Sequence, residues 1–206
     1  MNQGGVVWGH AARPIRGESE SGDLDVVAPF DGGVLLAVID GLGHGHEAAV
    51  VAAAAARVLV ADPAQSPTAL ADRCHEELRG SRGVALLIVS LSIRAGQCSW
   101  SGVGNVEGVR YRRRPAFATS RDHLISAPGV VGYRMPTLRE RWIDLALDDV
   151  LVLATDGVSP RFAEDIVADD APEAMACEIL MRHGRPSDDA LVLVARYAGA
   201  AQGALG

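Results

Sequence analysis

"VLLAVIDGLGHGHEAAVVAAAAARVLV", residues 34–60, is the stretch that decides the fold. Its apolar run from Val34 to Ile39 predicts a buried strand, and the run stops at an acid, Asp40. Three glycines and two histidines follow within six residues, and an alanine-rich run at 47–60 then predicts a helix that can pack close to a sheet. A carboxylate at the rigid end of a core strand, beside so flexible a turn, indicates a ligand site.

The other predicted elements are helices and short β-like runs. A second helix is predicted from Ser66, its N-cap, to Gly80. Asp170 with Glu173 forms a capping-box pattern for a third helix, which Gly184 closes. Strands are predicted at 84–93, 97–101, 106–112, 139–145, 150–154 and 191–197.

The order of these elements is α+β and favours two sheets covered by helices. The turns at 95–96 and 102–105 predict that three consecutive strands form an antiparallel meander. With 206 residues, the chain suits a single domain, 1–206, whose core we expect at about 20–197. The polar, glycine-rich beginning and the Ala/Gly-rich end from Ala198 are expected to be flexible.

Composition excludes several classes of protein. A net charge of −7 argues against a nucleic-acid-binding surface. No basic and apolar leader suggests a signal peptide, and no apolar run is suited to spanning a bilayer, so we expect a cytoplasmic protein without membrane attachment. Cys74, Cys98 and Cys177 are odd in number and far apart, and so predict buried free thiols rather than a zinc site or disulfides.

Acids recur at the ends of predicted strands. Asp156 and Gly157 follow the strand at 150–154 as Asp40 and Gly41 follow the first strand. Asp188-Asp189 precedes the last strand, and Asp23 follows Ser21-Gly22. A single Asp-Gly is usually a turn. If these strand ends meet, however, the carboxylates repel one another and take up protons unless divalent cations bind. Oxygen-only ligands favour Mg²⁺ or Mn²⁺ over zinc.

Five motifs in this order resemble those of bacterial PPM-type (type 2C-like) serine/threonine phosphatases. They are SGD at 21–23, DGLGHG at 40–45, GVGNVEG at 102–108, ATDGV at 154–158 and SDDALVLV at 187–194. The segment PGVVGYRMP at 128–136 further resembles the short RsbX branch, which is related to the SpoIIE and RsbU phosphatase domains. The resemblance covers about residues 20–197 and implies an αββα sandwich of two antiparallel sheets flanked by helix pairs, with a metal site at one edge.

The resemblance also implies a role for each acid. Asp40 would bridge two divalent cations, Mn²⁺ or Mg²⁺. Asp23 and the Gly41 carbonyl would bind the second cation, and Asp156 and Asp188 the first. Asp40 and Asp156 would thereby be catalytic, through the bound metals and a bridging water. Such a pair of cations would lower the pKa of that water, and the resulting hydroxide would attack the phosphorus of a phosphoserine or phosphothreonine without a phosphoenzyme.

Some positions depart from the family pattern. Leu42 stands where eukaryotic relatives keep a histidine thought to protonate the leaving oxygen, so a metal-bound water would take that role. His44 could reach the substrate, or it could fix the loop by a hydrogen bond. His46 is expected to be exposed in the first helical turn. Asp189 is expected to support the metal ligands without binding the metal itself.

Arginines give no secure substrate-binding site. Arg13 and Arg16 are weak candidates for binding phosphate, with a solvated surface role as the alternative. The basic run of Arg110 and 112–114 is either a solvated strand end or a docking patch for an acidic phosphoprotein. Substrate-binding residues therefore stay unassigned.

By resemblance, the substrates would be phosphorylated STAS-domain regulatory proteins of a bacterial stress-response partner-switching system, such as stressosome scaffolds. Two other functions stay open. The chain could be a catalytically inactive interaction module with this fold. Alternatively, the glycine-rich turn could cradle a nucleotide, although Asp40 would repel its phosphates and neither common nucleotide motif is present.

Overall fold

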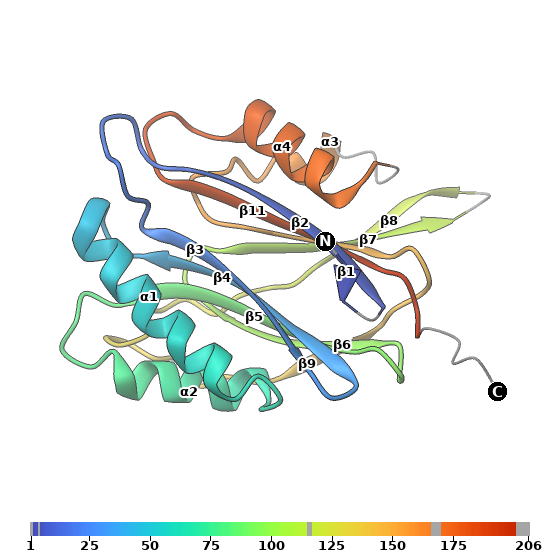
Figure 1. Cartoon of the computed structure of the whole chain (residues 1–206), viewed down its shortest axis with the longest axis horizontal. Coiled ribbons are helices and arrows are strands. Elements are labelled where there is room, and N and C mark those ends of the chain that lie inside the picture. Colours follow the sequence, from blue (N-terminus) through green and yellow to red (C-terminus); the bar gives the residue numbers. More distant parts are fainter. Residues whose placement is uncertain (1, 4, 115–116, 166–169, 201–206) are drawn as a thin grey trace.

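The computed structural model describes residues 2–3, 5–114, 117–165 and 170–200. Two antiparallel sheets pack face to face, and helices cover their outer faces (Figure 1). This confirms the predicted α+β sandwich. The predicted strands and the three predicted helices are all present, with end points shifted by a few residues.

One sheet has five strands, with the long buried run of residues 34–39 near its centre. The strands, in spatial order, are β3 (Asp23–Phe30), β4 (Gly33–Gly41), β5 (Val84–Ser92), β6 (Gln97–Val103) and β9 (Arg141–Asp144). β4 is paired on both sides, and its two faces are both covered. That double burial explains why its sequence is continuously apolar rather than alternating. β3 was missed because, as an edge strand, it tolerates Asp25 and Pro29.

The other sheet has six strands and begins earlier in the chain than the sequence indicates. Its order is β1 (Asn2–Gln3), β2 (Val6–Arg13), β11 (Ala190–Tyr197), β10 (Val150–Ala154), β7 (Glu107–Arg114) and β8 (Phe117–His123). β2 pairs with β11 along its full length, and Val6 is fully buried between the sheets. The backbone partners supplied by β11 therefore order a segment that looks polar and glycine-rich by itself.

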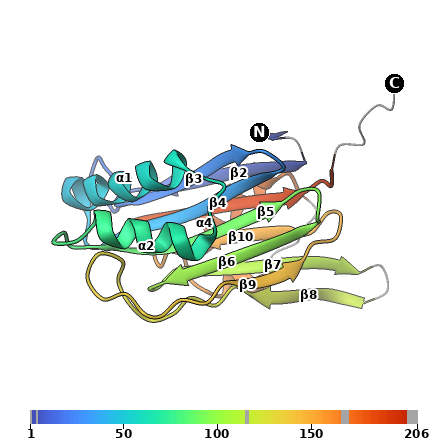
Figure 2. The same ribbon diagram turned by 90° about the horizontal axis from the view of Figure 1, so that it is seen from below.

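Each sheet carries its own helices. The helices α1 (Gly45–Ala61) and α2 (Pro67–Glu77) cover the five-stranded sheet, and α3 (Phe162–Asp165) and α4 (Pro172–His183) cover the six-stranded sheet (Figures 1 and 2). The buried face of α1 includes Ala48, Ala52 and Ala55, whose small side chains allow the predicted close approach. Ser66 caps α2 as predicted, because its Oγ accepts a 3.3 Å hydrogen bond from Ala69 N. No described helix is both long and apolar enough to span a membrane.

The core consists of three apolar layers, and alternation along β4 connects two of them. Val34, Leu36 and Val38 enter the layer between the two sheets. Leu35, Ala37 and Ile39 enter the layer beneath α1 and α2. Each fully buried large aliphatic side chain contributes about 1.5–3 kcal/mol. The strand that carries Asp40 is therefore among the most firmly held in the molecule.

Three local predictions are wrong. β6 and β7 form no hairpin, because after Gly104, whose φ is 89°, the chain crosses to the other sheet and pairs with β10. Asp170 does not cap α4, whose N-cap is Ala171 with proline at the first position. Cys177 is exposed on α4, whereas Cys74 and Cys98 are free and buried as expected. The flexible end predicted from Ala198 falls largely on residues 201–206, outside the described residues.

Candidate metal centre

The acids singled out in the sequence lie together at one end of the sandwich. Asp23 and Asp40 are direct partners in the register of β3 and β4. Asp156 follows the end of β10, and Asp188 precedes the start of its antiparallel neighbour β11, so both lie at the same end of the six-stranded sheet. A hydrogen bond of 2.6 Å, donated by Thr155 Oγ1 to Asp23 Oδ2, connects the two sheets at this end.

Burial and mutual repulsion favour the protonated forms of Asp23, Asp40 and Asp188. The pKa of Asp40 is raised to about 8, first by burial and then by the charges of neighbouring aspartates, led by Asp23. Burial also raises the pKa of Asp23 to about 7, although the Thr155 hydroxyl opposes this shift. The pKa of Asp188 is raised by burial and by the charge of Asp156. Several carboxylates in such a place cannot all be ionised unless a cation joins them.

The donor chemistry of the cluster fits a divalent cation. All the predicted side-chain ligands offer carboxylate oxygens, which Mg²⁺ and Mn²⁺ prefer. Burial first, and the charges of neighbouring acids second, raise the pKa values of Asp23 and Asp40, so a bound cation would favour their ionised forms. Over the described part of the chain, no three or more His, Cys, Asp or Glu side chains already form a metal cage. The fit therefore rests on the kind of donor and its electrostatics, and the assignment of each ligand stays a prediction.

The cluster opens to solvent through a cleft of about 410 Å³. Asp40, Asp156 and Asp188 line the cleft, whereas Asp23, 6% exposed, and Asp189, 3% exposed, do not. The remaining walls include residues 42–44 of the turn before α1, together with Gly104, Asn105, Gly129, Val130 and Ser187. A phosphoryl group on a protein side chain could enter this open cleft.

The two Asp-Gly glycines are needed for space rather than for an unusual backbone conformation. A Cβ atom at Gly41 would collide with the backbone of Ala48 in α1, and one at Gly157 would collide with the backbone of Asp189. Neither residue has a positive φ; the left-handed turn before α1 is made by Gly43 and Gly45, with φ of 100° and 69°. The glycines therefore allow α1 and the start of β11 to approach the acids.

Three polar side chains support the cluster from outside the predicted ligand set. Asp189 accepts hydrogen bonds from Ile15 N (2.7 Å) and Gly22 N (2.8 Å), which fits the supporting role suggested for it. Thr155 holds Asp23, and Asn105 Nδ2 donates to Asp156 Oδ2 at 3.0 Å. Thr155 belongs to the ATDGV motif and Asn105 to the GVGNVEG motif. Their neighbours along the chain gave no sign of which acid each would reach.

The turn before α1 is tied to the N-terminal loop by histidines. His44 Nδ1 lies 3.1 Å from Glu18 Oε1, and His46 Nδ1 lies 2.9 Å from Glu20 Oε2. His44 also lines the cleft, but its contact with Glu18 accords with fixing the loop. His46 is exposed in the first turn, as predicted. Leu42 lines the cleft at the position where the resembled eukaryotic enzymes have histidine, and offers no proton there.

The structure separates the candidate arginines. Arg13 donates through Nη2 to the carbonyl of Arg185 (2.9 Å), and the exposed Arg16 has no side-chain hydrogen bond within the described residues. Arg185, which none of the five motifs includes, donates to the Asp156 carbonyl at 3.1 Å, and its charge opposes the upward pKa shift of Asp188. It lies three residues before Asp188, so proximity along the chain could have suggested it.

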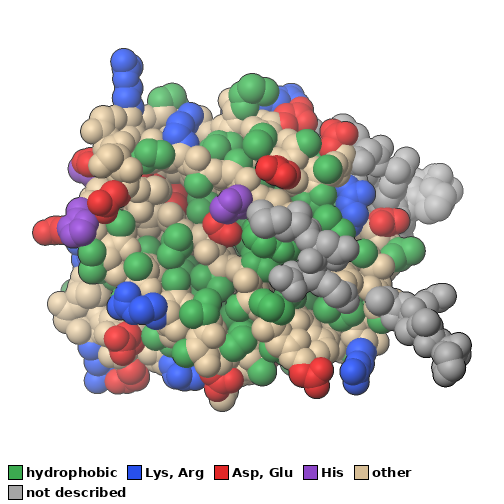
Figure 3. Space-filling view, in the orientation of Figure 1, with side chains coloured by type: hydrophobic (Ala, Val, Ile, Leu, Met, Phe, Trp, Pro, Cys, Tyr) green, Lys and Arg blue, Asp and Glu red, His purple; other side chains and the backbone are tan. Residues whose placement is uncertain are grey.

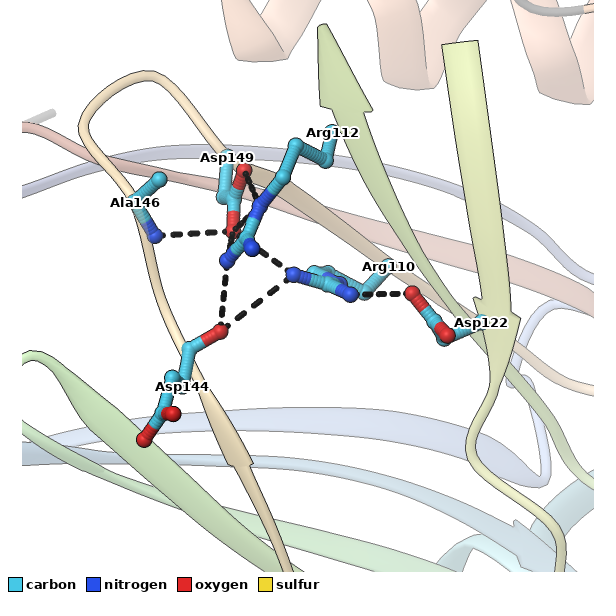
Figure 4. Close-up of polar contacts among 6 residues, drawn as sticks. All are labelled: Arg110, Arg112, Asp122, Asp144, Ala146 and Asp149. Atoms are coloured by element: carbon cyan, nitrogen blue, oxygen red, sulfur yellow. Dashed lines mark hydrogen bonds and ion pairs between the residues drawn. The ribbon is translucent and has the colours of Figure 1, made fainter. Parts of the chain in front are cut away.

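The basic run has neither of its two predicted roles at the described positions. Arg110, 7% exposed at its side chain, donates to Asp149 Oδ2 at 3.1 Å and also pairs with Asp122. Arg112 donates to the same carboxylate at 2.8 Å and to the Asp144 carbonyl at 2.7 Å (Figure 4). Both arginines are therefore parts of a partly buried ionic network. The side chains of residues 113 and 114 lie outside the described set.

The described face in Figure 3 carries arginines singly, with acids between them, and no continuous basic surface.

Fold and cluster together define a PP2C-like phosphatase fold with carboxylates gathered at one end of its sandwich. The profile described as "Stage II sporulation protein E (SpoIIE)" matches residues 31–198, and the chain belongs to this family. No curated protein sequence matches the chain.

Solved structures support the same fold. A chain from work on "The bacterial stressosome: a modular system that has been adapted to control secondary messenger signaling" is 27% identical, with a TM-score of 0.83 over 93% of this chain and 99% of that one. RsbX in complex with magnesium is 18% identical, with a TM-score of 0.84 over 96% and 98%. A chain with the PP2C phosphatase domain and a fragment of the regulatory domain of SpoIIE from Bacillus subtilis is 17% identical, with a TM-score of 0.71 over 93% of this chain and 61% of that one.

Proposed function

We propose that the chain is a divalent-metal-dependent protein phosphatase that hydrolyses phosphoserine or phosphothreonine. The observation that carries the proposal is the acidic cluster, whose raised pKa values mark it as a site for cations, at the end of a PP2C-like sandwich. Membership of the SpoIIE family and the magnesium in the RsbX structure support it.

In this proposal the cluster holds two cations, Mn²⁺ or Mg²⁺. Asp40 would be shared between them, with Asp23 and the Gly41 carbonyl on one side and Asp156 and Asp188 on the other. When bound, such cations supply a nucleophile from water at neutral pH and offset phosphoryl charge. Thr155 and Asn105 orient Asp23 and Asp156 through their hydrogen bonds, and so fix the directions of the carboxylate oxygens.

The remaining cleft residues determine how substrate is held and protonated. Leu42 cannot donate a proton, and His44, which lines the cleft, contacts Glu18. Protonation of the departing serine or threonine oxygen therefore falls to water. Arg185 donates to the Asp156 carbonyl and its charge acts on Asp188, and we propose that it attracts the substrate's phosphoryl group.

We propose phosphorylated STAS-domain regulators of a partner-switching system as the substrates, in the cytoplasm. The support is the 27% identical chain from the stressosome study, which matches over nearly the whole of both chains, together with the fold shared with RsbX. This system would use the enzyme to reverse phosphorylation by a serine/threonine kinase.

The direct test is hydrolysis of p-nitrophenyl phosphate and of a kinase-phosphorylated STAS-domain protein, with Mn²⁺, with Mg²⁺ and with chelator. We expect activity with metal, loss with chelator and recovery when metal returns. A chain that binds Mn²⁺ by calorimetry yet hydrolyses neither compound would contradict the proposal. Tight binding of the unphosphorylated partner without hydrolysis would indicate an interaction module, and ATP binding without hydrolysis of either compound a nucleotide site.

A further inference from the structure

A second, smaller pocket opens at the edge of the five-stranded sheet, where β6 changes its neighbour. β9 pairs with residues 97–100 of β6, and its ladder ends there. Beyond it, Ala127 takes over, donating from its N to Gly102 O at 2.8 Å and accepting from Gly104 N at 2.9 Å. The change of neighbour leaves a pocket of about 140 Å³, lined in part by Ser101, Ser126, Arg139 and Arg141.

The polar groups of this pocket have donor capacity to spare. Arg139 and Arg141 are exposed, and neither side chain forms an ion pair or hydrogen bond within the described residues. Ser101 is only 4% exposed, and its hydroxyl likewise has no partner in the described part of the chain. Two guanidinium groups and a buried hydroxyl make a site for an oxyanion. Arg110 and Arg112, by contrast, are already bound to Asp149.

The surroundings favour an anion carried by a polypeptide over a free one. Ile125, which lines the pocket, is 60% exposed, and Trp142, next to Arg141 on β9, is 62% exposed. Successive side chains of a strand point to opposite faces, so Trp142 lies on the other face of β9 from Arg141. Exposed aromatic and arginine side chains are both frequent in protein interfaces. β9 is also the last strand of its sheet, and at its end the Asp144 carbonyl already accepts from Arg110 and Arg112.

The pocket is close to the acidic cleft along the same two segments. Gly102 and Ala127 line the pocket, and two residues further along each segment Gly104 and Gly129 line the cleft. Two residues of extended chain span about 7 Å. A peptide whose phosphorylated residue enters the cleft would therefore carry a residue a few positions away past Arg139 and Arg141.

We propose that this pocket binds an acidic side chain that flanks the phosphorylated residue of the substrate protein. The inference rests on the proposed phosphatase function and adds a sequence preference to it. A chain with a net charge of −7 and an acidic cleft repels acidic segments elsewhere on its surface. The two free arginines would therefore fix the direction in which the substrate segment lies.

The test compares two phosphothreonine peptides that differ only in having glutamate or glutamine on both flanks. Arg139→Ala combined with Arg141→Ala should lower kcat/KM for the glutamate peptide roughly tenfold, through KM. The kcat/KM values for the glutamine peptide and for p-nitrophenyl phosphate should change less than about twofold. Arg57→Ala combined with Arg94→Ala is the matched control, because it removes two exposed arginines that lie outside the pocket and form no described ion pair.

An equal loss of kcat/KM for both peptides, or the same loss in the control variant, would overturn the proposed role of the pocket. The phosphatase proposal would still stand. If the wild type hydrolyses nothing, the phosphatase proposal fails. Calorimetry with the unphosphorylated glutamate peptide then tests the pocket by itself, with weaker binding expected in the double variant. A second variant, Arg139→Glu, should shift the preference towards a lysine-flanked peptide; an unchanged preference would also count against the pocket.

Discussion

Strand β10 has a buried acidic site near each end, and the two sites are compensated in opposite ways. Asp149, just before the strand and 1% exposed, has its charge met by Arg110 and Arg112. Beyond the other end, Asp23 and Asp40 face further aspartates, and their pKa values are raised to about 7 and about 8. The fold places two arginines beside Asp149 but none in an ion pair with Asp23 or Asp40 among the described residues. The difference indicates that the second site is built to receive cations from outside the chain.

The largest expected effect comes from breaking the uncompensated site. Asp40→Asn should reduce metal-dependent hydrolysis of p-nitrophenyl phosphate by about a thousandfold or more, because the proposed shared ligand is lost. The same change removes a repelling charge, so the metal-free variant should be at least as stable as the wild type at pH 8. Activity assays with Mn²⁺ and urea denaturation with chelator measure the two effects. Retained activity in both Asp40→Asn and Asp156→Asn would exclude the two-metal arrangement.

A change at Asp149, the compensated site, should lower stability and leave activity unchanged, the opposite of the result expected for Asp40→Asn. Asp149→Asn leaves Arg110 buried with less counter-charge, which should lower the free energy of unfolding by about 3 kcal/mol. Hydrolysis per folded molecule should be unchanged, since Asp149 is at the far end of β10 from the cleft. Urea denaturation followed by far-ultraviolet circular dichroism measures the loss.

A surface pair provides the control for Asp149. Glu178 and Arg182 form an i,i+4 pair on α4 with side chains about half exposed. Glu178→Gln should therefore cost no more than about 0.5 kcal/mol. If both variants lost the same small free energy of unfolding, the network in Figure 4 would stabilise the fold no more than a surface ion pair. The proposed difference between the two ends of β10 would then be wrong.

The sequence predicts the layers of this fold better than its connections. Runs such as 34–39 and 150–154 are apolar because both faces of the strand are buried, and that property can be read locally. The path after Gly102 cannot be read in this way, because β7 pairs with strands distant in the sequence. β2 was missed for the same reason, because its extended conformation depends on pairing with β11, whose residues lie more than 170 positions later.

The acids of the site were predictable for a related reason. Asp40, Asp156 and Asp188 adjoin readable strands, so their positions follow from the strand ends. The side chains that hydrogen-bond to these acids were not predictable, because they are distant in the sequence. Thr155 is 132 residues from its partner Asp23, and Asn105 is 51 residues from its partner Asp156. The arginine run misled for the same reason, since its partner Asp149 is 37 to 39 residues away.

The uncompensated site should also make the metal-free protein sensitive to pH. Folded Asp23 and Asp40 keep protons that the unfolded chain releases near the ordinary pKa of 3.8. Between that value and about pH 8 the folded state binds more protons, so the free energy of unfolding falls as pH rises, by about 1.4 kcal/mol per pH unit for each proton difference. Thermal denaturation with chelator between pH 5 and pH 8 measures this decline.

Added cations and the other end of β10 provide the controls for the pH profile. Mn²⁺ or Mg²⁺ should flatten the decline, because a bound cation replaces the protons. Asp149→Asn should shift the whole profile down without changing its slope. A flat profile for the metal-free wild type would mean that the acids at the cleft are compensated after all.

The smallest effect expected at the acidic site comes from a single hydroxyl that partly compensates it. Thr155 Oγ1 donates to Asp23 and lowers its pKa, and it also accepts from Leu191 N at 2.9 Å. Thr155→Val removes both bonds at nearly constant volume, so Asp23 should hold its proton more strongly and Mn²⁺ should bind roughly tenfold more weakly at pH 7. Thr155→Ser keeps the hydroxyl and should bind Mn²⁺ within about twofold of the wild type. Calorimetric titration of both variants decides the point: equal affinities would show that this hydrogen bond between the sheets does not prepare Asp23 for a cation.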